Sequence, residues 1–126
     1  MIRFLFSISI LISGSVFSNN VLNLNDIIYY QSNYDSESKS EDLIAYITKQ
    51  DPCISVINLN DNKTKRYCEM GNSGINLEKE YPTSYVLKLY VSPISVSFIV
   101  AAPWNEQKCK ILAFHEKITC EPTGKN

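Results

Sequence analysis

Four cysteines constrain the fold of this 126-residue chain more than any other feature. They form two sequence pairs, Cys53 with Cys68 and Cys109 with Cys120, separated by 15 and 11 residues. Zinc ligands usually lie closer together along the chain, and a catalytic thiol must stay unpaired. An even number of cysteines instead favours complete pairing in an oxidising compartment, although four cysteines allow three different pairings. We therefore expect two structural disulfides.

The N-terminus predicts export. Met1-Ile2-Arg3 is a short basic start, and residues 4–12 are apolar except for two serines, which is the length of a signal-peptide core and too short for a membrane span. Small residues precede Asn19, so residues 1–18 read as a signal peptide and residues 19–126 as one exported domain. Cleavage after Ser15 is the alternative. The predicted location is the periplasm or the outside of the cell.

The composition of the expected mature chain argues against nucleic acid and membranes as partners. It carries 11 basic and 13 acidic residues, which gives a net charge of −2. It lacks a cluster of basic residues of the kind that contacts the phosphates of nucleic acid. It has no apolar run long enough to span a membrane. Six acids and two bases fall in residues 19–51, against seven acids and nine bases in residues 52–126. We expect neither nucleic-acid binding nor stable membrane insertion.

Two helices are predicted near the N-terminus of the domain. Asn25 is placed to cap a short helix that begins at Asp26. Ser38 and Glu41 have the spacing of a capping box, and the apolar residues that follow share one helical face until Asp51-Pro52, which predicts a helix over residues 39–50. Residues 32–40 read as a loop.

Beyond Pro52 the pattern predicts strands and hairpins. A two-residue turn at Asn60-Asp61 puts Cys53 directly opposite Cys68. A turn at Phe114-His115 likewise puts Cys109 opposite Cys120, with Lys110, Lys117 and Thr119 on the other face. Directly opposed residues on neighbouring strands are close enough to bridge when they form a non-hydrogen-bonded pair. The hairpin register therefore predicts two local disulfides, Cys53 to Cys68 and Cys109 to Cys120.

The segment 85–100 has the clearest alternation of apolar residues. A turn at Ser92-Pro93 would pair the inward residues as Val91 with Ile94, Leu89 with Val96, Leu87 with Phe98 and Tyr85 with Val100. A proline at the second turn position requires a cis peptide bond or a wider turn. Residues 70–83 read as a long loop. The predicted fold class is α+β: N-terminal helices packed on a small antiparallel sheet of hairpins and stapled by two disulfides.

Catalytic chemistry is poorly represented in the sequence. His115 is the only histidine, and its neighbour Glu116 would point to the opposite face of a strand. The loop carboxylates Glu69, Glu78, Glu80 and Glu106 could form a hydrolytic pair only if folding brought two of them together. The sequence contains no hydrolase, zincin, phosphate-loop or EF-hand motif, so no metal or other cofactor is expected. A glycosylation sequon, Asn62-Lys63-Thr64, falls at a predicted hairpin tip.

Aromatic residues outside the best core strands point to binding. Tyr29, Tyr30, Tyr34 and Trp104 are of the types that anchor protein interfaces, although each could instead pad a small core. The function expected is that of a non-enzymatic exported domain that binds another protein, such as an inhibitor or an immunity protein. The alternatives are a small secreted hydrolase or toxin that uses carboxylates with or without His115, and a surface or pilus-associated structural module.

Overall fold

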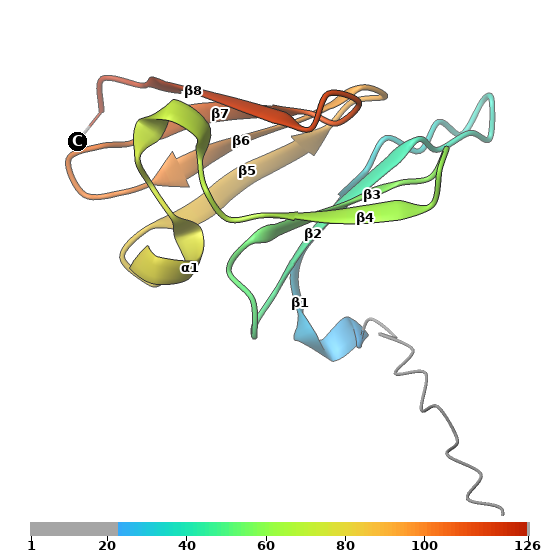
Figure 1. The fold of residues 1–126 in the computed structure, drawn as a ribbon. Helices are drawn as coiled ribbons and strands as arrows, with labels where there is room; N and C mark the ends of the chain where they lie inside the picture. Colours follow the sequence, from blue (N-terminus) through green and yellow to red (C-terminus); the bar gives the residue numbers. More distant parts are fainter. Residues whose placement is uncertain (1–22, 126) are drawn as a thin grey trace, which may run out of the picture.

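The computed structural model describes residues 23–125 and consists mainly of two four-stranded antiparallel sheets (Figure 1). The first sheet has the order β1 (Ile27–Ser32), β2 (Leu43–Thr48), β3 (Ile54–Asn58) and β4 (Lys63–Tyr67). The second has the order β5 (Tyr85–Val91), β6 (Ser95–Ala101), β7 (Gln107–Leu112) and β8 (Lys117–Pro122). Each strand pairs with its neighbour in sequence. The predicted signal peptide, residues 1–18, lies outside the described residues.

One hydrophobic core joins the two sheets. Side chains alternate between the faces of a strand, and the buried members of that alternation, such as Leu43 and Ile54 in the first sheet and Phe98 and Ile111 in the second, belong to one cluster. Figure 1 shows the sheets as two layers. None of the helical segments within residues 23–125 is long and apolar enough to cross a membrane.

The predicted α+β class is wrong, because no N-terminal helix packs on a sheet within the described residues. Asn23, not Asn25, caps a single 3₁₀ turn, η1 (Leu24–Asp26), by accepting a hydrogen bond from the backbone N–H of Asn25 at 3.0 Å. Strand β1 begins directly after this turn.

The helix predicted over residues 39–50 is also wrong, since β2 occupies its centre. Leu43, Ala45 and Ile47 are buried while the residues between them are partly exposed, which is the two-residue period of a strand. The expected capping residues serve the preceding loop instead: Ser38 Oγ lies 2.6 Å from Ser40 Oγ, and Glu41 accepts a hydrogen bond from Ser32.

The long connection between the sheets contains two short helical segments that the sequence did not predict. These are η2 (Gly71–Ser73) and α1 (Leu77–Glu80). Asn76 caps α1 by accepting hydrogen bonds from the backbone N–H groups of Glu78 and Lys79. The η2 segment lies on the free edge of β8, where Asn72 Oδ1 accepts from the backbone N–H of Cys120 at 3.2 Å.

Both predicted disulfides are confirmed. Cys53 pairs with Cys68 and Cys109 with Cys120, with Cα–Cα distances of 4.8 and 4.1 Å. Both hairpins have the predicted register, and Lys110, Lys117 and Thr119 lie on the face opposite the second disulfide. Each disulfide therefore lies within one sheet, and neither joins the two sheets. Two disulfides are compatible with an oxidising compartment.

The predicted register of the β5–β6 hairpin is wrong. Next to the turn Val91 pairs with Val96, because the turn is wider than the two-residue turn predicted. A bulge between Leu87 and Tyr90, with Lys88 at a φ of 52°, then shifts the register again, so that Val86 pairs with Val100. Of the two alternatives, a cis peptide bond at Pro93 or a turn wider than two residues, the structure has the wider turn. Across it the backbone N–H and the hydroxyl of Ser92 donate to the carbonyl oxygen of Ser95, and the Ser92 hydroxyl accepts from the backbone N–H of Ser95. Ile94 lies outside β6 and is exposed.

Candidate functional site

The outward side chains of the first sheet form a continuous neutral surface. Strand alternation puts two rows of residues there, Tyr30–Tyr46–Ser55–Arg66 and Ser32–Ile44–Ile57–Thr64. We call these eight residues the tyrosine face. Tyr30 is 49% exposed, and Ile44, Tyr46 and Ile57 are partly exposed, so none of the aromatic or aliphatic members is sealed in the core. In the described part of the chain, no other segment covers this face enough to bury one of these residues.

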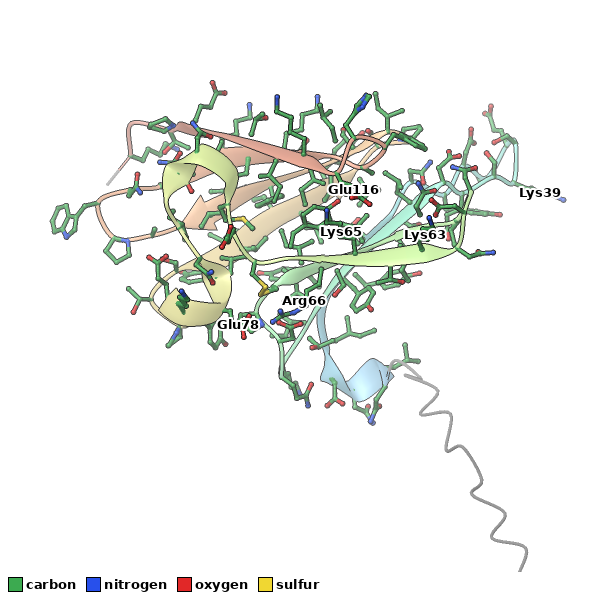
Figure 2. The ribbon with its side chains drawn as sticks, in the orientation of Figure 1. Lys39, Lys63, Lys65, Arg66, Glu78 and Glu116 are labelled. Carbon is green, nitrogen blue, oxygen red and sulfur yellow. A yellow bond between two sulfur atoms is a disulfide. The ribbon has the colours of Figure 1, made fainter. Side chains whose placement is uncertain are left out.

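Charge is nearly absent from the tyrosine face. Arg66 is its only charged member, and its guanidinium is already engaged (Figure 2). The Nε and Nη2 atoms of Arg66 donate to the two carboxylate oxygens of Asp51 at 2.6 and 2.9 Å, and Nη2 also donates to Glu78 Oε2 at 3.0 Å. The centres of protein interfaces are depleted in charge and enriched in aromatic residues, which is the composition found here.

The Arg66 contacts also set the local electrostatics. The bidentate hydrogen bonds from Arg66 hold the pKa of Asp51 below its ordinary value, and the same contacts raise the pKa of Arg66. Asp51 precedes β3, Arg66 lies in β4 and Glu78 lies in α1, so the cluster ties three elements together beside the Cys53–Cys68 disulfide.

A groove of about 320 Å³ lies on the other side of β1, where β1 and β2 approach β5. We call it the tyrosine groove, and its lining contains no charged residue: Ile28, Tyr29, Ile47, Pro52, Tyr81, Pro82, Tyr85 and Val86. Tyr29 and Tyr30 are adjacent in β1, so the strand places one tyrosine in the groove and the next on the tyrosine face. The edge strand β1 therefore connects two neutral aromatic surfaces.

The structure separates the four aromatic residues that the sequence singled out. Tyr29 is partly buried in the tyrosine groove, and Tyr30 belongs to the tyrosine face. Tyr34 is 58% exposed in the β1–β2 connection, where its backbone N–H donates to Ser32 Oγ of the tyrosine face. Trp104 belongs to the β6–β7 connection, which lies at the end of the molecule opposite the β1–β2 connection (Figure 1).

Trp104 is the most exposed large hydrophobic side chain of the described residues, at 82%. The possibility that it pads the core is therefore wrong. Its φ of 64° lies in the left-handed region, which a bulky residue rarely adopts. Trp104 therefore stays a candidate binding residue.

Sequence reasoning missed the centre of the tyrosine face. The sequence pattern predicts a helix at Ile44 and Tyr46, and it predicts a hairpin strand at Ile57 without indicating which face is bound. The available signal for a strand was composition, because residues 43–48 are rich in β-branched and aromatic types, with Ile44, Tyr46 and Thr48 at the even positions. Tyr81 and Tyr85 of the groove were missed because the sequence does not show which segments meet across the two sheets.

The residues considered for catalysis do not form a recognisable reaction centre. His115 is exposed in the β7–β8 turn, while Glu116 accepts from Lys65 Nζ at 3.0 Å (Figure 2). Glu78 is held by Arg66. Glu69 and Glu80 line one surface depression together with Lys79, but Glu80 already accepts from the backbone N–H of Asn76.

Metal binding has one geometric candidate within the described residues. Cys53 Sγ, Cys68 Sγ and a carboxylate oxygen of Glu78 lie within 4.8 Å of one another. Both sulfur atoms belong to the disulfide, so neither is the thiolate that a metal requires.

Two other residues from the sequence analysis lie in connections. Glu106 lies in the β6–β7 connection, and Asn62 of the glycosylation sequon is exposed in the β3–β4 turn, as predicted.

Comparison of the chain with protein-family models, with curated proteins and with solved structures finds no match.

Proposed function

We propose that this protein is an exported, non-enzymatic domain that binds another protein through the tyrosine face. The observation that carries the proposal is an uncharged patch of Tyr30, Ile44, Tyr46 and Ile57, flanked by serine and threonine hydroxyls, that the rest of the described chain leaves partly or fully exposed. Tyrosine buries a large area on binding with little loss of side-chain entropy, and hydroxyls at the rim supply hydrogen bonds. An inhibitor or immunity-type protein of the periplasm or the extracellular space needs this kind of preformed surface.

The other proposed binding residues extend this surface or act apart from it. Tyr34 follows Ser32 of the tyrosine face, and we assign it to the rim of the same interface. Tyr29 lines the tyrosine groove on the far side of β1, where a protruding apolar side chain of the partner would fit. Trp104 belongs to the β6–β7 connection at the opposite end of the molecule (Figure 1), and we assign it to a separate contact.

The test compares two exposed aromatic residues. Tyr30→Ala removes the most exposed ring of the tyrosine face, whereas Phe114→Ala removes a ring of similar exposure, 51%, in the β7–β8 turn. Each protein is immobilised and incubated with the native secreted or periplasmic fraction, and the bound protein is then purified for affinity measurement. We expect a stoichiometric partner that wild type and Phe114→Ala retain, and a loss of about 2 kcal/mol or more, roughly thirtyfold in Kd, for Tyr30→Ala.

Thermal melts must show that all three proteins remain folded. Equal affinity of the partner for Tyr30→Ala and wild type would contradict the proposal. It would also fail if the pure protein hydrolysed peptidoglycan, nucleic acid or peptides and lost that activity when Glu69 and Glu80 were changed to Gln.

A further inference from the structure

The outer face of the second sheet differs from the tyrosine face in being basic. Strand alternation turns the odd-numbered residues of β7 and the even-numbered residues of β8 inward, including Cys109 and Cys120, and turns the residues between them outward. Leu112 of β7 and Ile99 of β6 also point outward and are partly exposed. We call the polar outward residues the lysine face: Lys108, Lys110, Lys117, Thr119 and Glu121, together with Ser97 of β6. All of these except Ser97 are exposed, and Ser97 is partly exposed.

The three lysines of this face are available for a ligand. Lys108, Lys110 and Lys117 take no part in the three ion pairs found in the described residues. Lys110 is paired with Ser97 on one neighbouring strand and with Thr119 on the other, so a hydroxyl-bearing residue flanks its position on each side. Lys108, Lys110 and both hydroxyl residues line one shallow depression of about 470 Å³, with Glu121 also contributing to its lining.

The positive charge of the lysine face contrasts with an excess of acidic residues elsewhere in the molecule. The acidic excess of residues 19–51 falls, within the described residues, on η1 and on the β1–β2 and β2–β3 connections of the first sheet, and not on its strands. The expected mature chain has a net charge of −2, so an acidic ligand is repelled by the molecule as a whole and attracted by the lysine face. Such separation of charge orients an approaching partner.

We propose that the lysine face binds an acidic segment of a partner protein, whose carboxylates lie near Lys108 and Lys110 and accept hydrogen bonds from Ser97 and Thr119. Nucleic acid fits less well, because three lysines with a glutamate among them cannot follow a phosphate backbone. This inference goes beyond the proposed function, since it assigns a second surface on the opposite side of the two-layer fold.

The experiment titrates a synthetic peptide of alternating glutamate and serine into the isotope-labelled mature protein and follows backbone amide shifts by NMR. We expect shifts confined to β6, β7 and β8, and binding that weakens as ionic strength rises. The double variant Lys108→Gln/Lys110→Gln should bind the peptide about three- to tenfold more weakly, because each exposed ion pair contributes modestly.

A matched control removes the same charge elsewhere. Lys39 and Lys79 are exposed in the β1–β2 connection and in α1 (Figure 2 labels Lys39), and Lys39→Gln/Lys79→Gln should change the affinity by less than about twofold. Equal weakening by the two double variants would show a net-charge effect and overturn the proposal.

Two further results would also overturn it. One is tighter binding of a single-stranded oligonucleotide than of the peptide through the same lysines. The other is salt-sensitive self-association of the protein that Lys108→Gln/Lys110→Gln abolishes, which would make a second copy the occupant. Tyr30→Ala should leave peptide binding unchanged, so the outcome is independent of the tyrosine face.

Discussion

Tyr29 and Tyr30 are adjacent in sequence but lie on two different surfaces of the protein. Both were selected from the sequence for the same reason, an aromatic ring outside the best core strands. Because consecutive residues of a strand point to opposite faces, Tyr29 lines the groove between the sheets and Tyr30 contributes to the outer face. Residue type identified both as candidates, but only the register of β1 against β2 distinguishes their surroundings.

Asp51 provides a prediction at the same scale, through its contact with Arg66. A carboxyl group whose pKa is lowered by folding contributes stability above its unfolded-state pKa, near 4, and that contribution is lost as the pH falls through the folded-state pKa. We expect Asp51→Asn to lower the free energy of unfolding at neutral pH by at most about 1 kcal/mol, since the pair is partly exposed. The difference from wild type should shrink below about pH 4.

Urea unfolding at neutral and acid pH measures this difference. The amide side chain introduced by Asp51→Asn keeps an oxygen that can accept from the backbone N–H of Cys53, so the variant tests the charge rather than the turn. Asp61→Asn is the control, because Asp61 lies in the β3–β4 turn and forms none of the ion pairs of the described residues. A difference for Asp51→Asn that stayed constant with pH would contradict the assignment.

Among the elements, the two disulfide-bonded hairpins could be predicted and β2 could not. In the first hairpin the turn residues Asn60-Asp61 and the opposed cysteines give the same register. In the second, Phe114-His115 is a weak turn signal, and the register follows from setting Cys109 opposite Cys120 and Ile111 opposite Ile118. Residues 43–48 are apolar on both faces of the strand, so their pattern also fits one face of a helix, and the capping-box spacing of Ser38 and Glu41 favoured that choice. Tertiary pairing with β1 and β3 decides in favour of the strand.

The β5–β6 hairpin illustrates a different limit. Its strands were located correctly, but the bulge at Lys88 moves the inward positions of β5 by one residue. Nothing in the residue types there marks a bulge, since Lys88 has a positive φ without being glycine or asparagine. The register of such a hairpin is therefore set by packing of Val86 and Leu89 into the shared core.

Gly71 gives a prediction for the η2 segment. It has a φ of 53°, and a Cβ there would lie 2.7 Å from the carbonyl oxygen of Ile118 in β8. Gly74 has a φ of 79° but open space around it. We expect Gly74→Ala to cost about 1 kcal/mol of stability through backbone strain alone, and Gly71→Ala about 2–3 kcal/mol because η2 must also move off β8. Denaturant unfolding of both variants checks this, and equal losses would refute the close approach.

At the scale of the whole molecule, each sheet is cross-linked by its own disulfide. The loop-closure model assigns roughly 3 kcal/mol to a disulfide that closes about 15 residues, and slightly less to the shorter loop. We expect the double variants Cys53→Ala/Cys68→Ala and Cys109→Ala/Cys120→Ala to lose stability by about these amounts.

Chemical unfolding followed by fluorescence measures both losses, and a peptide map of the unreduced protein verifies the pairing. A peptide joining Cys53 to Cys109 or Cys120 would contradict the structure. If either double variant were as stable as wild type, the disulfide that it lacks would not add to the free energy of unfolding, and the prediction would be wrong.

The candidate site could be predicted only in part, for a reason that belongs to the molecule rather than to single residues. Exposure of Tyr30, Tyr34 and Trp104 agrees with their selection from the sequence. The tyrosine face as a surface depends on four strands aligned in register, and the tyrosine groove depends on β5 and the segment before it meeting β1. Such relations arise from long-range packing, which local periodicity does not encode.

The pairing of every strand with its sequence neighbour bears on how the chain folds. No strand crosses from one sheet to the other within the described residues, so the hydrogen-bonded ladders of each sheet join residues close in sequence. This arrangement has a low contact order for an all-β protein, and little loop-closure entropy is lost before pairing begins. We therefore expect faster folding than for a Greek-key sandwich of equal length, with each meander able to form from successive hairpins before the two layers associate.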